Sequence, residues 1–311
     1  MVRLFRVGLV TTILLCLAAC AAKPAEQTGS STAEITSAAE FPFPEFPFPE
    51  MTSTDAVATQ TELPVVAPPG TAGGPGSQQA GPTQPAPPPT ALEIVTVVIP
   101  EGFTFYQVAR RLEANGVCSA ADFTVAAQGY QIQSFHAPVS PRGCYRMEGM
   151  LFPDTYEFYM GDDPTVVLRK MLNNYSEKSG LPDYNTLILA SIIERETRSD
   201  SHMAMVSSVF HNRLKTGMPL QADATIAYVE EHIKQDSLVK NPGQYADLYN
   251  TYKCRALPEG PICSPGLRAI EAAKNPSQSG YLYYFFGKDE TNHYTYTYDE
   301  HLAAIKMYGL G

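Results

Sequence analysis

The sequence predicts an α+β fold, in which a small module of one strand and two helices precedes a larger domain of mixed helices and strands. A β-branched apolar run at 94–99 predicts a strand. An almost continuous apolar segment at 187–197 is too long for a typical strand and predicts a buried helix. Two aromatic runs near the end of the chain, at 281–286 and 293–298, flank a polar turn and predict a β-hairpin.

The first residues of the chain predict export from the cytoplasm. Arg3 and Arg6 precede an apolar run at 9–17 that is too short to span a bilayer comfortably. Leu17-Ala18-Ala19-Cys20 then resembles the bacterial lipobox, so we expect a signal peptide at 1–19 and a lipidated Cys20. An ordinary cleaved signal or a short membrane anchor is the alternative. Either way, we expect the rest of the chain outside the cytoplasm, anchored to the bacterial membrane.

Residues 20–92 differ from the rest in composition. Between 21 and 92 the chain is rich in Pro, Ala, Gly, Ser and Thr, with one Lys and seven acidic residues. Such a segment cannot bury enough apolar surface to offset the entropy lost on ordering, so we expect a disordered tether. The net charge of the whole chain is −10, and this acidic balance gives no reason to expect a nucleic-acid partner.

A small module is expected at 93–147. After the strand at 94–99, Pro100-Glu101-Gly102 turns the chain, and Thr104 is suited to cap a helix. A second helix is expected to start at Ser119. Two interpretations stay open for this module: a structural cap on the domain that follows, or a glycan-binding module of the LysM kind that binds cell walls.

The second domain is expected at 148–311. A helix should run from Pro164, which follows Asp163 and suits a first helical turn, to about Tyr175. The helix at 187–197 follows, then the hairpin, and Asp299 is expected to cap a last helix at 301–308.

The helix at 187–197 carries two acids that point in nearly opposite directions. At 100° per residue, Glu196 falls between Ile192 and Ile193 in an apolar stripe, whereas Glu194 falls near Leu187. A carboxyl group on an apolar face is either paired or has a raised pKa, which suits it to donate a proton near neutral pH. Pairing of Glu196 with an Arg, for instance Arg213, is the structural alternative.

Cysteine spacing suggests two disulfides after export. Cys118 with Cys144 and Cys254 with Cys263 are the expected pairs in an oxidising compartment, and four inert thiols are expected otherwise. No metal site is expected, because the sequence has no CxxC motif and its His residues are scattered. No cofactor is expected either.

Several motifs, in order along the chain, resemble the endolytic murein transglycosylase family (MltG/YceG-like). They lie at 148–155 (EGMLFPDT), 190–197 (ASIIERET), 206–214 (VSSVFHNRL), 217–228 (GMPLQADATIAY), 257–262 (LPEGPI) and 264–266 (SPG). The resemblance runs from about Ile99 to the C-terminus. It implies cleavage of peptidoglycan glycan strands near the membrane, with Glu196, the second acid of the Glu-x-Glu-Thr motif, as the catalytic residue. The chain departs from the family at two motifs: the expected Asp-Pro-Thr is Asp223-Ala-Thr225, and the expected Asn-Pro-Gly is Ser264-Pro-Gly266. Members of the family also usually carry a transmembrane anchor instead of a lipobox.

Five further residues are candidates for binding sugar hydroxyls and acetamides: Gln221, Asp223, Thr225, Asn250 and Tyr252. Asp223 could equally cap a short helix, and Asn250 and Tyr252 could form a structural turn. His293 is expected to be structural.

We therefore expect a lytic transglycosylase that leaves 1,6-anhydro ends and limits the length of nascent strands. Its expected partners are peptidoglycan glycan strands, the membrane through the N-terminal lipid and, from the family, peptidoglycan synthases. A hydrolytic muramidase and a non-catalytic wall-binding lipoprotein, in which Glu196 is structural, are the alternatives.

Overall fold

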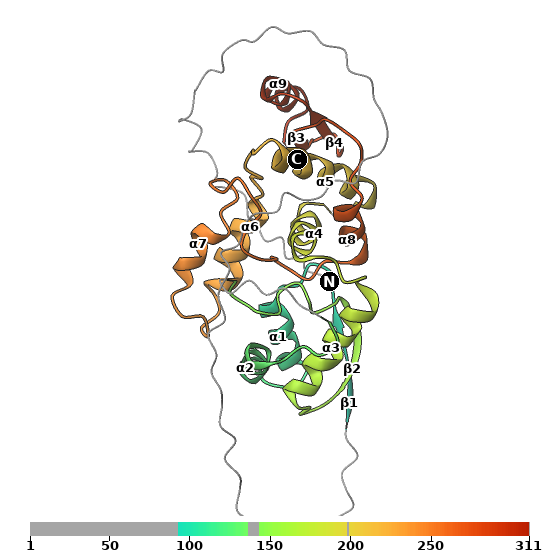
Figure 1. Cartoon of the computed structure of the whole chain (residues 1–311), viewed down its shortest axis with the longest axis vertical. Helices are drawn as coiled ribbons and strands as arrows, with labels where there is room; N and C mark the ends of the chain where they lie inside the picture. Colours follow the sequence, from blue (N-terminus) through green and yellow to red (C-terminus); the bar gives the residue numbers. More distant parts are fainter. Residues whose placement is uncertain (1–92, 136–142, 198, 311) are drawn as a thin grey trace, which may run out of the picture. The chain divides into compact units, whose positions relative to one another are not determined.

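The computed structural model describes residues 93–135, 143–197 and 199–310. All of them belong to one compact unit of the chain, Pro82–Gly311. The signal peptide, Cys20 and the tether lie outside the described residues. The fold is α+β, as predicted, with two small antiparallel sheets among the helices (Figure 1).

The first layer of the fold consists of β1 (Ile94–Ile99), β2 (Asp154–Tyr159) and three helices, α1 (Phe105–Ala114), α2 (Ala120–Gly129) and α3 (Pro164–Lys178). The two strands pair antiparallel, with Ile94 opposite Tyr159 and Ile99 opposite Asp154. This pairing gives hydrogen-bond partners to backbone N–H and C=O groups of β1, which buries Val97 and Ile99 and exposes Ile94 and Val98. It also crosses the boundary predicted at residues 147/148, so the first sheet extends to Tyr159.

Local capping explains where the helices of this layer begin. The Thr104 side chain accepts a hydrogen bond from the backbone N–H of Gln107, whose side chain accepts one from the N–H of Thr104 in return. Asp163 accepts hydrogen bonds at the start of α3, where Pro164 occupies the first turn. These predicted starts are confirmed, and α3 continues past the predicted end at Tyr175.

The second layer is built around α4 (Tyr184–Glu196), in which every residue from Thr186 to Glu194 is buried. The helices α5 (Asp200–Lys215), α6 (Asp223–Tyr228) and α8 (Leu267–Lys274) pack against it (Figure 1). A π-helical turn at Val229–Ile233 continues α6. A 3-10 turn (Pro242–Gln244) leads into α7 (Tyr245–Leu248). Burial on all sides explains why the sequence of α4 is apolar around its whole circumference.

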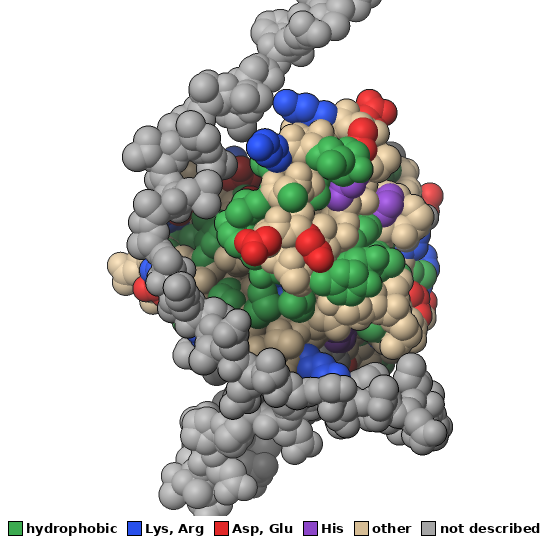
Figure 2. Space-filling view, turned by 90° about the horizontal axis from the view of Figure 1, so that it is seen from above, with side chains coloured by type: hydrophobic (Ala, Val, Ile, Leu, Met, Phe, Trp, Pro, Cys, Tyr) green, Lys and Arg blue, Asp and Glu red, His purple; other side chains and the backbone are tan. Residues whose placement is uncertain are grey.

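The chain ends in the predicted hairpin and helix. The strands β3 (Tyr283–Phe286) and β4 (Asn292–Thr295) pair antiparallel, and α9 (Tyr298–Tyr308) packs on them. Thr297, not Asp299, caps α9, because its hydroxyl accepts from the N–H of Glu300 in a capping box. Figure 2 looks onto this end of the molecule, where hydrophobic side chains lie between charged ones.

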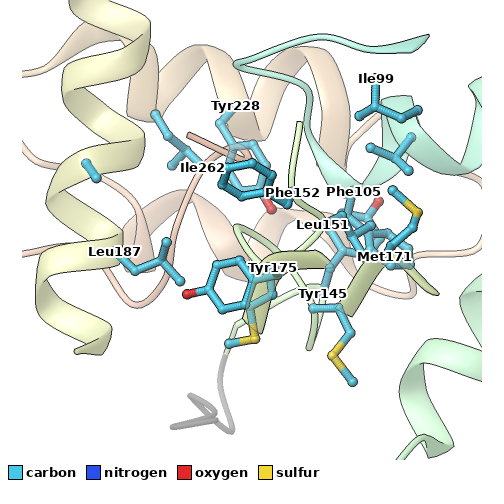
Figure 3. Close-up of a cluster of buried hydrophobic side chains, with 14 of the residues drawn as sticks. Ile99, Phe105, Tyr145, Leu151, Phe152, Met171, Tyr175, Leu187, Tyr228 and Ile262 are labelled. Atoms are coloured by element: carbon cyan, nitrogen blue, oxygen red, sulfur yellow. The ribbon is translucent and has the colours of Figure 1, made fainter. Parts of the chain in front are cut away.

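Both layers contribute to one hydrophobic core. Figure 3 shows Phe105 and Met171 of the first layer in the same cluster as Leu187, Tyr228 and Ile262 from later in the chain. The parts predicted as two domains therefore share a core among the described residues.

The predicted disulfides are not formed. All four cysteines of the described residues, Cys118, Cys144, Cys254 and Cys263, are free. The buried Cys263 donates to the carbonyl of Ser191 in α4, whereas Cys254 donates to the nearby carbonyl of Leu257. Burial raises the pKa of the Cys118 thiol to about 11 and that of Cys144 to about 12. Such thiols are inert near neutral pH.

Nothing in the described part of the chain has the length and apolar character that a bilayer-spanning helix needs.

Candidate active site

Glu196 is the last residue of α4 and is half-buried. The hydroxyl of Tyr284, on β3, donates a hydrogen bond to Glu196 Oε2 at 2.7 Å. The site therefore joins two segments separated by 88 residues in sequence, and the hairpin fixes the position of the carboxyl group.

The surroundings of Glu196 raise its pKa above the ordinary value of a Glu. Burial is the largest cause, and the negative charge of Asp223 acts in the same direction. The Tyr284 hydroxyl, the backbone N–H of Ala224 and the more distant Arg213 oppose it by stabilising the carboxylate. A carboxyl group balanced in this way can donate a proton and take one back.

Arg213 does not pair with Glu196. Its guanidinium group donates to the backbone carbonyls of Leu220 at 2.8 Å and Leu282 at 2.6 Å. Within the part of the chain that the structure describes, no ion pair joins it to Glu196. The structural alternative proposed from the sequence is therefore wrong, and Arg213 acts on Glu196 only as a nearby positive charge.

Glu194, two residues earlier, has a different environment. Its Oε2 accepts a hydrogen bond from the backbone N–H of Gly266, at 3.0 Å, where α8 begins. Burial, with the charge of Glu101, raises its pKa as well. The side chain of Glu194 exposes less of its surface than that of Glu196, but burial raises the pKa of both carboxyl groups. The apolar environment that the helical wheel gave to Glu196 therefore does not by itself separate the two acids.

Access to a pocket distinguishes Glu196 from Glu194. A cavity of about 340 Å³ opens beside Glu196, between the end of α4, the start of α5 and the hairpin. Its lining residues are Glu196, Thr197, Ser199, His202, Phe286, Glu290 and Asn292. Glu194 does not line this cavity. Of the two acids, Glu196 is thus the one that this pocket makes accessible to a ligand.

Two of the five predicted binding residues, Asp223 and Tyr252, lie close to Glu196, and a third, Gln221, bonds Arg213. Asp223 and Tyr252 both interact electrostatically with Glu196, and the Tyr252 hydroxyl donates a hydrogen bond to Asp223. Gln221 is exposed, and its side-chain oxygen accepts from Arg213 at 3.1 Å. Asp223 does not cap α6: the N-cap residue is Ala222, and no side chain caps it. The capping alternative is therefore wrong.

The other two predicted binding residues hold a turn together. Thr225 is fully buried, and its hydroxyl lies 2.8 Å from the carbonyl of Ala222 and 3.0 Å from the hydroxyl of Thr251. Asn250 accepts from the backbone N–H of Tyr252 at 3.0 Å. Thr225 is thus not placed on the surface of the site, and Asn250 orients the turn that presents Tyr252.

Tyr284 and Asn292 belong to the predicted hairpin, but neither of them, nor His202, was assigned an individual role from the sequence. Tyr284 and Phe286 alternate along β3, so they share one face of the hairpin, and that face meets the site. On β4, Tyr294 is paired with Tyr284, and its hydroxyl oxygen lies 3.2 Å from His202 Nδ1. This period-two alternation was the signal that could have found Tyr284. His293, by contrast, bonds Asp289 within the turn, as expected for a structural residue.

No group of three or more His, Cys, Asp or Glu residues that could hold a metal ion occurs among the described residues. The chemistry that these side chains offer is proton transfer by a carboxyl group and hydrogen bonding to a polar ligand. Fold and site together define an α+β protein with an acid–base carboxyl group at a polar pocket.

Comparison with known proteins assigns the chain to a family. Residues 84–307 match the YceG-like family, and the chain belongs to it. It is 35% identical over 176 residues to the endolytic murein transglycosylase of Bacillus subtilis (strain 168), covering 52% of this chain and 48% of that protein. The endolytic murein transglycosylase of Streptococcus pneumoniae (strain D39) is 30% identical over 222 residues, covering 61% and 40%. The chain thus spans less than half of the length of these curated relatives.

A solved structure agrees with the fold. The crystal structure of a putative YceG-like protein from Listeria monocytogenes superposes with a TM-score of 0.54 at 28% identity. The match covers 67% of this chain and 75% of the Listeria chain.

Proposed function

We propose that the chain is an endolytic lytic transglycosylase that cleaves peptidoglycan glycan strands between N-acetylmuramic acid and N-acetylglucosamine. Membership of the YceG-like family and the names of the relatives support this reaction. The observation that carries the proposal is the Glu196 carboxyl, which has a raised pKa, accepts the Tyr284 hydroxyl and lines the pocket.

In this reaction Glu196 acts twice. Its protonated carboxyl first donates its proton to the glycosidic oxygen, and the bond from that oxygen to C1 of N-acetylmuramic acid breaks. The C6 hydroxyl of the same sugar then attacks C1, and the Glu196 carboxylate takes the proton of that hydroxyl. The product carries a 1,6-anhydro ring, and Glu196 is protonated again. An intramolecular hydroxyl replaces water at a large effective concentration, so a second carboxylate is not needed.

The neighbours of Glu196 divide the remaining tasks. Tyr284 orients the carboxyl group and stabilises its charged form during the second step. Asp223, Tyr252 and Gln221 offer a carboxylate, a hydroxyl and an amide to the sugar, close to the reacting bond. The pocket residues Phe286 and Asn292 offer an apolar surface and an amide.

Sequence features support a proposal for the setting of the enzyme. We propose that Cys20 carries a lipid, that the tether at 20–92 extends from the outer face of the membrane, and that the enzyme limits the length of nascent strands beside peptidoglycan synthases. The first layer, whose β1 and helices α1 and α2 match the order predicted for a LysM-like module, is proposed to bind the glycan.

The test is mass spectrometry of peptidoglycan after incubation with the full chain. We expect fragments with anhydro ends, lighter than hydrolysis products by one water, and none with Glu196→Gln. Glu194→Gln is the matched control, because it changes a buried acid of the same helix that does not line this pocket. Glycan bound without cleavage by the wild-type chain would contradict the proposal and favour a wall-binding lipoprotein.

One observation favours a second candidate, a hydrolytic muramidase. Asp223 supplies another carboxylate near Glu196, and hydrolysis of a glycosidic bond ordinarily uses two. Fragments with reducing ends of full mass, lost in both Glu196→Gln and Asp223→Asn, would establish hydrolysis. Anhydro ends that persist in Asp223→Asn would exclude a requirement for the second carboxylate.

A further inference from the structure

The short helix α6 connects the candidate active site to the first layer. At its N-terminal end, the charge of Asp223 and the backbone N–H of Ala224 act on the Glu196 carboxyl. At its C-terminal end, the Tyr228 hydroxyl donates to Glu148 Oε2 at 2.8 Å. A helix of this length spans about 9 Å, so a shift at one end is carried to the other.

Glu148 joins this helix to α1. Its Oε1 accepts a hydrogen bond at 2.9 Å from the backbone N–H of Phe105, the first residue of α1. The side chain is buried and touches both layers of the fold, because Phe105 belongs to the first layer and Tyr228 to the second. Figure 3 shows these two aromatic residues in the shared core.

The environment of Glu148 makes this link specific. Tyr228, Tyr249, Tyr145 and Cys144 interact with it electrostatically, and within the described residues it forms no ion pair. Burial raises its pKa to about 7. A buried carboxyl without a cation is costly unless hydrogen bonds satisfy it, so the geometry of its donors is tightly constrained.

A second contact between the same elements supports the link. The ring of His232, in the π-helical turn that follows α6, lies 6.3 Å from that of Tyr228 and 6.4 Å from that of Tyr106 in α1. π-helical turns inside helices frequently occur at functional sites. The end of α6 that is remote from Glu196 is thus held against α1 by a hydrogen-bonded carboxyl and by aromatic packing.

We propose that Glu148 is a positioning residue: through Tyr228 it fixes α6, and so sets the distance of Asp223 and Ala224 from the Glu196 carboxyl. The arrangement couples the first layer to catalysis, so a glycan bound to that layer acts on the chemical step through α1. This proposal rests on the proposed function for its effect on catalysis.

The test compares Tyr228→Phe with Tyr156→Phe in the full chain. Each variant removes one buried tyrosine hydroxyl. The hydroxyl of Tyr156, on β2, donates to the carbonyl of Phe152 and accepts from Asn174 of α3, so its loss removes no hydrogen bond to Glu148. For Tyr228→Phe we expect kcat to fall roughly 10- to 100-fold, as misplacement near a reacting group does, with KM nearly unchanged. We also expect a displaced alkaline limb of the pH–rate profile. Tyr156→Phe should lower thermal stability alone.

A second measurement does not depend on activity. The pKa of Glu196 is followed by NMR of the chain labelled with ¹³C at the Glu carboxyls, with Glu196→Gln giving the assignment. A displaced titration in Tyr228→Phe and in Glu148→Gln, but not in Tyr156→Phe, supports the link even if the wild-type chain cleaves no glycan. An unchanged titration and an unchanged kcat in Tyr228→Phe would overturn it and leave Glu148 a structural residue.

Discussion

The two sides of α4 carry the same chemical group in two different settings. Glu194, on the side of α8, bonds a backbone N–H at the start of that helix. Glu196, on the side of the hairpin, bonds a tyrosine hydroxyl and lines a pocket. Burial raises the pKa of both. Depth of burial therefore does not identify the candidate catalytic acid. Glu196 is distinguished by its access to the pocket and by the Tyr284 hydroxyl, which can bond both the protonated and the charged carboxyl group.

The largest expected difference between the two acids is in the rate of glycan cleavage after substitution. Glu196→Gln keeps the shape of the side chain but cannot give or take the proton, so we expect cleavage to fall by roughly 10²- to 10⁴-fold. Its thermal unfolding midpoint should stay near that of the wild type. Glu194→Gln should retain most of the activity per folded molecule. Equal losses in the two variants, measured by release of soluble fragments, would mean that the pocket does not distinguish the acids.

The next largest effect is on stability, where we expect substitution of Glu194 to cost more than substitution of Glu196. Glu194→Ala leaves the buried N–H of Gly266 without its acceptor, which costs about 1–3 kcal/mol of the free energy of unfolding. Urea unfolding followed by circular dichroism measures this cost. Glu196→Ala, at the half-buried end of the helix, should cost less. A larger loss for Glu196→Ala would show that the hairpin contact, not the α8 contact, holds α4.

A smaller effect is expected at the edge of the site. Tyr252→Phe removes the hydroxyl that donates to Asp223 and is offered to the sugar, and a hydrogen bond of 0.5–1.5 kcal/mol corresponds to a change of roughly 2- to 10-fold in KM. We expect kcat to change little. Steady-state kinetics on a defined glycan strand separates the two constants. A large fall in kcat would place Tyr252 in the chemical step.

The smallest expected effect is on the pH dependence of kcat/KM. The first step needs protonated Glu196, so kcat/KM should fall as pH rises through its pKa, which lies above the ordinary Glu value. In Tyr284→Phe the carboxylate loses a donor, the pKa of Glu196 rises, and the alkaline limb moves to higher pH. In Asp223→Asn a repelling charge is lost, that pKa falls, and the limb moves to lower pH. Shifts in the same direction would contradict this electrostatic account.

Features set by short stretches of chain were predictable from the sequence. Thr104 and Asp163 begin their helices as expected, and the hairpin and the apolar helix occur where their residue patterns place them. A cap or a turn depends on neighbouring residues alone, so its signal lies within a few positions.

Contacts between distant segments were less predictable. The pairing of β1 with β2 joins segments about sixty residues apart, and a lone strand signal does not name its partner. The candidate site showed the same limit: the helical wheel and the family resemblance both indicated Glu196, whereas neither identified Tyr284 as its hydrogen-bond donor. The proposed pairing with Arg213 failed because backbone carbonyls occupy that guanidinium group.

The all-round burial of α4 also has a consequence for the order in which the chain is made. Its cover from α8 begins about 70 residues downstream, and at 5–20 residues per second the helix is synthesised roughly 4–14 s before that partner. During this interval a run of Leu, Ile and Ala side chains has no native cover on that side, and such surfaces self-associate. The helix that carries the candidate acid is therefore also a segment of the nascent chain that a chaperone would have to protect until α8 is made.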